Sequence, residues 1–149
     1  MRKLIFILAF MLLNSGVSVF GQDKNTIKNL ENQCQACLDK GQYMLGCSKI
    51  YYSQMDSLLN VVYNKLISSC DSTQRRNLKV QQINWLTKRD RYFKNKLSEV
   101  MKSNSSINFI PQDDEMIMIH ENTDFVKLRI FELLKLKNRD FNYGKVNHK

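Results

Sequence analysis

Apolar and aromatic residues recur at every third or fourth position through three long stretches of this chain. That spacing is the repeat of one face of an α-helix, on which side chains three and four positions apart lie together. In the first stretch the repeating residues are Tyr51, Met55, Leu59, Val62 and Leu66. They predict a helix from about Leu45 to Ser69 with this face buried.

The second stretch follows the polar sequence "SCDSTQ", in which Asp71 or Ser72 is suited to cap the start of a helix. We expect this helix to continue to about Lys102. The residues expected on its buried face are Leu78, Trp85, Leu86, Phe93, Leu97 and Val100.

The third stretch follows "SNSSINFIPQDD", which interrupts the helical pattern. We expect a helix that begins near Asp113 and covers Thr123 to Asn138, and we expect residues 142–149 to fray. The residues expected on its buried face are Ile119, Val126, Ile130 and Leu133.

Residues that interrupt helices are scarce in this chain. Pro111 is the single proline, and the only glycines after residue 21 are Gly41, Gly46 and Gly144. No stretch alternates for long with the period of a strand. The expected fold class is therefore all-α, an antiparallel bundle of three main helices with a disulfide pinning the N-terminal segment.

The first 21 residues have the composition of an export signal peptide. Arg2 and Lys3 precede the apolar run "LIFILAFMLL", and small residues follow it. A membrane-spanning helix needs about twenty apolar residues, so we expect cleavage after Gly21 and no transmembrane segment thereafter. Residues 22–149 then form a single domain of a periplasmic or secreted protein.

Four cysteines in an exported chain predict at least one disulfide: Cys34, Cys37, Cys47 and Cys70. If Cys47 and Cys70 lie on one helix, roughly 35 Å separates them. A disulfide needs Cα atoms within about 7 Å. We therefore expect Cys47 to bond Cys34 or Cys37, with Cys70 outside this bond or available for an intermolecular one.

Motifs for catalysis or cofactor binding are weak. The "CQAC" sequence at 34–37 lacks the strand and helix context of a redox motif, and Leu38 stands where covalent haem attachment needs histidine. His120 and His148 lack the paired spacing of a zinc site. The acids at 113–115 suit the start of a helix. We expect no enzymatic activity, no cofactor and no metal site.

The chain is basic, with a formal charge of +9 that falls to +7 once Arg2 and Lys3 leave with the signal peptide. The basic residues of the expected second helix are Arg75, Arg76, Lys79, Lys88, Arg89, Arg91, Lys94, Lys96 and Lys102. Because an exported protein does not meet nucleic acid, no nucleic-acid partner is expected. Anionic envelope polymers or lipid headgroups are the partners that this charge favours.

Polar residues interrupt the apolar faces of the first two helices at helical spacing. On the first helix they are Asp56, Asn60 and Tyr63. On the second helix they include Gln82 and Arg89, which share a face with Trp85. Such facing sets are typical of contacts between helices, so we expect an interhelical polar network rather than an active site.

The order and spacing of these residues resemble the LprI-type lysozyme inhibitor family, whose members are small exported helical domains. The stretches that carry the resemblance are "MLGCSKIYYSQMDSLLNVVYNKL", "LKVQQINWLTKRD" and "TDFVKLRIFEL". The matching positions are Cys47, Asp56, Leu59, Asn60, Tyr63, Gln82, Trp85, Arg89, Asp90, Thr123, Arg129 and Leu133. The resemblance spans about residues 34–136 and covers most of the expected domain.

The resemblance implies that the protein blocks lysozyme by covering the enzyme's cleft, so the expected partner is a lysozyme or another envelope protein. Relatives often carry a cysteine shortly after the Arg-Asp pair, where this chain has Tyr92 and Phe93, which implies that a second disulfide is absent. The familiar animal lysozymes are cationic, so a basic partner needs a local acidic patch to bind them. A module that binds an anionic polymer or surface through the basic second helix is the alternative expectation.

Overall fold

The computed structural model describes residues 19–146, and the side chains of residues 23–137. This part of the chain forms four α-helices and no strand: α1 Val19–Leu38, α2 Met44–Ser68, α3 Ser72–Ser103 and α4 Gln112–Val146. The all-α prediction is confirmed. The count of three helices is wrong, because the segment expected to be pinned by a disulfide is itself a helix. Residues 1–18 of the predicted signal peptide lie outside the described residues, and residues 19–21 form the first turn of α1.

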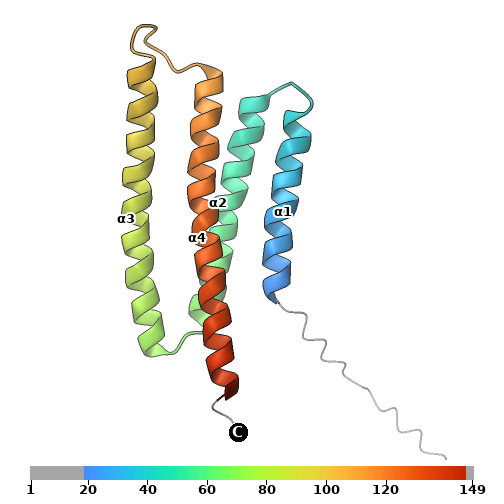
Figure 1. Ribbon diagram of the computed structural model, residues 1–149, viewed down its shortest axis with the longest axis vertical. Coiled ribbons are helices and arrows are strands. Elements are labelled where there is room, and N and C mark those ends of the chain that lie inside the picture. The colour runs from blue at the N-terminus through green and yellow to red at the C-terminus, as the bar shows by residue number, and fades with distance from the viewer. Residues whose placement is uncertain (1–18, 147–149) are drawn as a thin grey trace, which may run out of the picture.

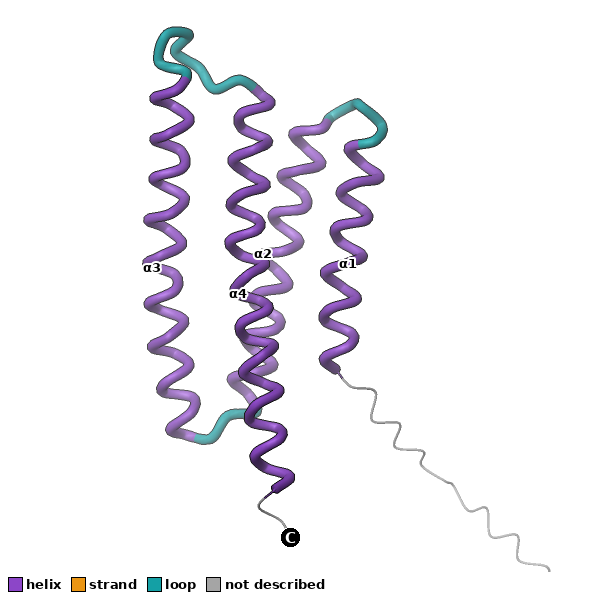
Figure 2. The backbone as a smooth tube through the Cα atoms, viewed as in Figure 1, coloured by secondary structure: helices purple, strands orange, loops and turns teal. Residues whose placement is uncertain are grey.

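Successive helices run in opposite directions, as Figure 1 shows. The two central helices, α2 and α4, make the most extensive contact, while α1 packs on α2 and α3 packs on α4. The longest connection, residues 104–111, joins α3 to α4 at one end of the bundle (Figure 2). Most of the core therefore lies between α2 and α4, and α1 and α3 flank it.

The helix missed from sequence, α1, buries only a narrow apolar stripe. The buried and half-buried members of this stripe are Ile27, Leu30, Cys34 and Leu38. Near the start of the helix the carboxylate of Asp23, which is 3% exposed, lies 3.2 Å from Lys65 Nζ on α2. The remaining described side chains of α1 are mostly polar, which is why its helical pattern is faint in the sequence.

The core is supplied mainly by α2. The residues predicted for its buried face, Tyr51, Met55, Leu59, Val62 and Leu66, are each at most 5% exposed, so this prediction is confirmed. The turn before α2 has positive φ angles of 66° at Gly41 and 56° at Tyr43. The ring of Tyr43 occupies the space that a Cβ at Gly46 would need. Glycine at position 46 therefore allows the tyrosine to fold back over the first turn of the helix.

The start of α3 is closed by a capping box, in which side chains satisfy backbone N–H groups that have no helical partner. Asp71 Oδ1 accepts hydrogen bonds from the backbone N–H groups of Thr73 and Gln74 at 2.8 Å, and Gln74 Oε1 accepts from the Asp71 N–H at 3.1 Å. Asp71 is thus the cap, rather than Ser72. Buried residues of α3 are limited to Leu78, Gln82 and Trp85. Leu97 is 41% exposed, so its predicted burial is wrong.

The last helix, α4, begins one residue before the predicted start and extends to Val146. Fraying of residues 142–149 is therefore wrong for 142–146, because one glycine costs a helix only about 1 kcal/mol. Residues 147–149 lie outside the described part. Of the predicted buried face, Val126, Ile130 and Leu133 are 0% exposed, and Ile119 is half-buried.

Candidate functional site

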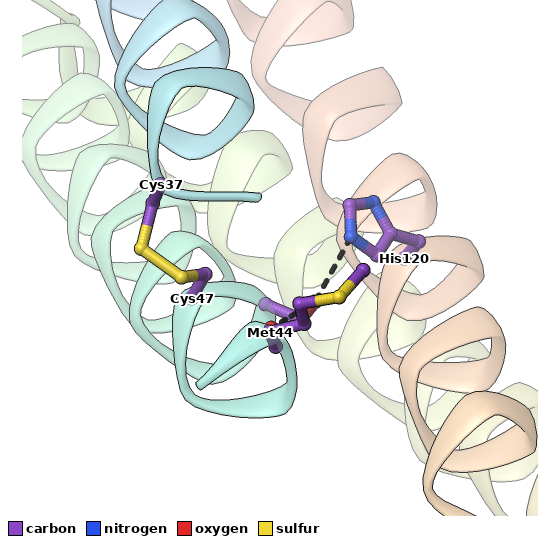
Figure 3. Close-up of a disulfide and its surroundings, with 5 residues drawn as sticks. Cys37, Met44, Cys47 and His120 are labelled. Carbon is purple, nitrogen blue, oxygen red and sulfur yellow. Dashed lines mark hydrogen bonds between the residues drawn. A yellow bond between two sulfur atoms is a disulfide. The ribbon is translucent and has the colours of Figure 1, made fainter. Parts of the chain in front are cut away.

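A disulfide links the end of α1 to the first turn of α2, as Figure 3 shows. It joins Cys37 to Cys47, with 5.8 Å between the two Cα atoms. Of the two partners left open by the sequence, Cys37 is therefore the one that Cys47 uses. Cys34 remains a thiol in the core, and burial raises its pKa above the ordinary value. Since the thiolate is the nucleophilic form, Cys34 is held in its unreactive state.

Beside the disulfide, His120 of α4 points toward the first turn of α2 (Figure 3). Its Nε2 atom lies 3.1 Å from the hydroxyl of Ser48, which is fully buried. The hydroxyl donates its proton to the carbonyl oxygen of Met44 at 3.2 Å. Because Ser48 has no exposed surface that a substrate could reach, this pair joins two helices and is not placed to act as a nucleophile with its base.

The polar residues predicted on one face of α2 occupy different surroundings. Asp56 Oδ1 lies 3.9 Å from Arg89 Nη1 on α3. Asn60 is exposed and makes no side-chain hydrogen bond with a described residue. Tyr63 is half-buried; burial raises its pKa, and the nearby positive charge of Arg129 opposes that rise. The structure therefore brings Asp56 and Tyr63 close to the motif residues of α3 and α4, and does not do so for Asn60.

Two arginines meet around Trp85. Arg129 of α4 donates from Nε to Gln82 Oε1 at 3.1 Å, and its guanidinium carbon lies 5.9 Å from the Trp85 ring centre. The guanidinium of Arg89 lies 5.7 Å from the same ring and also donates to Asp90 Oδ1 at 2.8 Å. Cation–π attraction and the buried hydrogen bond together hold α3 against α4 at this level.

A segment of acidic sequence, residues 103–126, which we call the tip, includes the loop between α3 and α4 and the first half of α4. It contains no lysine or arginine. Its five carboxylates belong to Asp113, Asp114, Glu115, Glu121 and Asp124. Ile107, Phe109 and Ile117 of this tip are 45%, 65% and 60% exposed. A shallow hollow of about 320 Å³ is lined by some of these acids together with Met116, Ile117 and His120.

Several acids of the tip contact cations from other parts of the chain. Glu115 lies 2.8 Å from Lys49, and Glu121 lies 3.1 Å from Lys96. Asp124 lies 2.7 Å from Lys127, while Asp113 forms no ion pair with a described residue. From the sequence, the acids at 113–115 were assigned only to the start of a helix. That interpretation missed that they lie on the same part of the surface as exposed apolar side chains. The signal that could have found it is the absence of basic residues from 103 to 126.

The surface of α3 has the opposite charge. Its cations without an acidic partner among the described residues are Arg75, Arg76, Lys79, Lys88, Arg91, Lys94 and Lys102. Between them lie Val80 and Ile83, which are 53% and 62% exposed. This helix therefore presents a mixed basic and apolar face to solvent.

Within the described residues, no three histidine, cysteine or acidic side chains cluster in a way that could hold a metal ion. The helices of the same part of the chain include none that is long and apolar enough to span a membrane.

Comparison with known proteins identifies one family. The family described as lysozyme inhibitor LprI matches residues 34–119, which cover the end of α1, all of α2 and α3, and the first turns of α4. The matched part includes the disulfide partners and the motif residues of α2 and α3. Arg129 lies beyond it. No curated protein and no solved structure matches the chain.

Proposed function

Because the chain belongs to the LprI lysozyme inhibitor family, we propose that it is an exported protein that inhibits a lysozyme by covering the enzyme's substrate cleft. The family match over residues 34–119 carries this proposal. The disulfide between Cys37 and Cys47 supports it, since such bonds persist in oxidising compartments outside the cytoplasm. In this function the protein binds another protein and catalyses no reaction.

The acidic tip is the surface best suited to such a partner. A cationic lysozyme is repelled by the overall charge of the chain, but Asp113 and Asp114 of the tip form no ion pair with a described residue and can attract it locally. Phe109, at 65% exposure, is a large apolar side chain that can enter a cleft and lose its contact with water there. Apolar side chains that enter the cleft and acids around them form the arrangement that interfaces commonly use.

Lysis of bacterial cell walls by several types of lysozyme, with and without the purified protein, tests this function. We expect at least one type to be slowed, with inhibition that weakens as salt rises. Phe109→Ala should weaken inhibition about tenfold or more, as loss of a central apolar contact does. The matched control is Ile83→Ala, which removes an equally exposed apolar side chain from α3.

If no lysozyme is slowed at any salt concentration, the proposed function is wrong. If a lysozyme is slowed and both variants inhibit as well as the natural protein, the function stands and the tip is not the contact surface.

The motif residues serve, in this proposal, to hold the helices together rather than to touch the enzyme. Asp56 of α2 lies close to Arg89 of α3. Arg129 of α4 contacts Gln82 and Trp85 of α3, and Arg89 also lies over the Trp85 ring. Asn60 has no such contact and stays without an assigned role. Substitution of the motif residues that contact a neighbouring helix is expected to lower stability, and to lower inhibition only as a consequence.

A second candidate function is favoured by the cations of α3 that lack acidic partners. An envelope module of this kind would bind an anionic polymer or lipid surface through the basic face of that helix. Binding to cell-wall or lipopolysaccharide preparations should then weaken steeply between 50 and 500 mM salt, on the order of tenfold or more. The double variant Arg76→Gln/Lys79→Gln should bind less, and salt-insensitive or absent binding would exclude this function.

The predicted export route is tested separately. Expression of the whole chain in a bacterium with an outer membrane, followed by N-terminal sequencing of the exported protein, should give a first residue of Gln22. Retention of the full chain in the cytoplasm would contradict the assignment of residues 1–21 as a signal peptide.

A further inference from the structure

A groove of about 400 Å³ lies between the first half of α3 and the middle of α4, and Phe125 is the one residue of the tip that lines it. Its size is within the range of small-molecule sites. From α3 it is lined by Gln81, Asn84, Trp85 and Lys88, and from α4 by residues that include Phe125 and Arg129. Polar and aromatic side chains therefore face the same opening.

The most informative residue of the groove is Arg129, which is 6% exposed. Its Nε atom donates to Gln82, and its Nη1 atom donates to Glu132 Oε2 at 2.9 Å. The Nη2 atom is buried and has no hydrogen-bond partner among the described residues. Buried donors in native proteins are nearly always satisfied, so a donor left over beside a groove indicates a missing acceptor.

Trp85 lines the same groove. The residue is 8% exposed, and its indole N–H makes no hydrogen bond with a described residue. Unlike Nη2 of Arg129, the indole nitrogen is not fully buried and keeps contact with solvent. It is therefore a donor that an occupant of the groove can use, in addition to the unsatisfied donor of Arg129.

The charge around the groove is positive. Lys88 forms no ion pair with a described residue, and the carboxylate of Glu132 is already bonded to Arg129. The amides of Gln81 and Asn84 at the rim are likewise not used in hydrogen bonds to described residues. An occupant must therefore bring acceptors and a negative charge. The ring of Phe125 already stacks on Tyr92 and Trp85, so the exposed apolar surface of the groove is that of Leu128, which is 61% exposed.

We propose that this groove binds a sugar that carries a carboxylate. A sugar ring has apolar C–H faces, one of which can lie against Leu128, and polar edges, which can bond to the amides of Gln81 and Asn84. The carboxylate supplies the acceptor and the charge that Arg129, Lys88 and the indole N–H lack, since a guanidinium and an ammonium both bind carboxylates well. The site shares only Phe125 with the tip and does not depend on lysozyme inhibition.

The sole tryptophan of the chain lines the groove, so its fluorescence reports on occupancy directly. We would titrate the purified protein with N-acetylmuramic acid and with N-acetylglucosamine, two related sugars of which the first carries a carboxylate and the second does not. A saturable change with N-acetylmuramic acid is expected, with binding at least tenfold tighter than that of N-acetylglucosamine. The indole N–H resonance in nitrogen-15 NMR should shift at the same concentrations.

Variants locate the binding. Lys88→Gln should weaken the binding of N-acetylmuramic acid at least fivefold. The control is Lys94→Gln, which removes an exposed cation of α3 that does not line the groove and should leave this binding unchanged. Arg129→Lys should weaken it further, with circular dichroism showing that the helices are retained.

The proposal is overturned if neither sugar gives a saturable change, if the two bind equally, or if Lys88→Gln and Lys94→Gln bind alike. Any of these results leaves the proposed lysozyme inhibition standing, because that function is measured independently at the tip.

Discussion

The two helices α2 and α3 differ in how much of each is buried. α2 has 25 residues and buries nine of them, along its length from the disulfide to its last turn. α3 has 32 residues and buries three, all in its first half. The reason is position, since α2 lies between α1 and α4, whereas α3 packs mainly on α4. The comparison teaches that α2 determines the fold, while much of α3 is left as surface.

The second half of α3 is held by aromatic contacts at its edge rather than by a buried face. Tyr92 stacks on Phe125 of α4 with ring centres 4.6 Å apart, and Phe93 lies 6.0 Å from Tyr52 of α2. These rings are half-buried. Such contacts keep the helix in place, and they leave its charged residues in water.

Loss of the Trp85 indole should have the largest effect, because it removes the principal buried side chain of α3. We expect Trp85→Ala to lower the free energy of unfolding by about 3–5 kcal/mol, as removal of a core aromatic does. Urea unfolding followed by circular dichroism measures this. A loss below about 1 kcal/mol would mean that α3 is not anchored through this residue, and the contrast with α2 would then be greater than described.

A matched pair of leucines compares the two helices directly. Leu59 on α2 is 2% exposed and Leu97 on α3 is 41% exposed. Leu59→Ala should cost about 2–5 kcal/mol of unfolding free energy, and Leu97→Ala about 1 kcal/mol or less. Equal losses in urea unfolding would contradict the difference in burial.

The disulfide between Cys37 and Cys47 stabilises the side of the molecule that contains α1 and α2. Closing a loop with a sequence separation of 10 is worth about 3 kcal/mol in the chain-entropy description. We expect Cys37→Ser to lose about this much, measured in a Cys34→Ser background so that the neighbouring thiol cannot replace the lost partner. The same background with Cys37 retained is the control, and equal stability of the two proteins would show that the bond is dispensable.

Alkaline pH should produce the smallest effect, and it should act through α2. Burial raises the pKa of Tyr51 and of Tyr52, so the folded state favours their protonated forms. That stability is fully present below the unfolded pKa of about 10 and is lost as pH rises through the raised folded values. The urea midpoint of the natural protein should be lower at pH 10.5 than at pH 8. The decrease should be smaller for Tyr51→Phe. An equal decrease in the two proteins would show that Tyr51 does not cause the loss of stability.

Much of the fold could be predicted from the sequence because α2 and α4 bury broad apolar faces. The spacing of Met55, Leu59 and Val62 has no other simple structural meaning. α1 could not be predicted in the same way, because Ile27 and Cys34 are separated by polar residues and the helix depends on its neighbour for stability. Helix formation there is a tertiary effect that a local pattern does not contain.

The candidate site was less accessible to sequence reasoning. Periodicity placed Asn60 on a face with Asp56, but α3 packs too little on α2 to cover it, so Asn60 remains in water. The groove beside Trp85 and Arg129 depends on how α3 lies against α4, and residues 44 positions apart in the chain form its walls. Which donors remain unsatisfied is visible only once all their neighbours have been placed.

The acids near the long loop are matched by lysines from other parts of the chain. Lys49 of α2 contacts Glu115, Lys96 of α3 contacts Glu121, and Lys127 contacts Asp124. Arg75, Arg76 and Lys79 at the start of α3, toward the opposite end of the bundle (Figure 1), have no acidic partner among the described residues. Added salt therefore screens attractions at one end and repulsions at the other, so the two ends should respond to ionic strength in opposite directions.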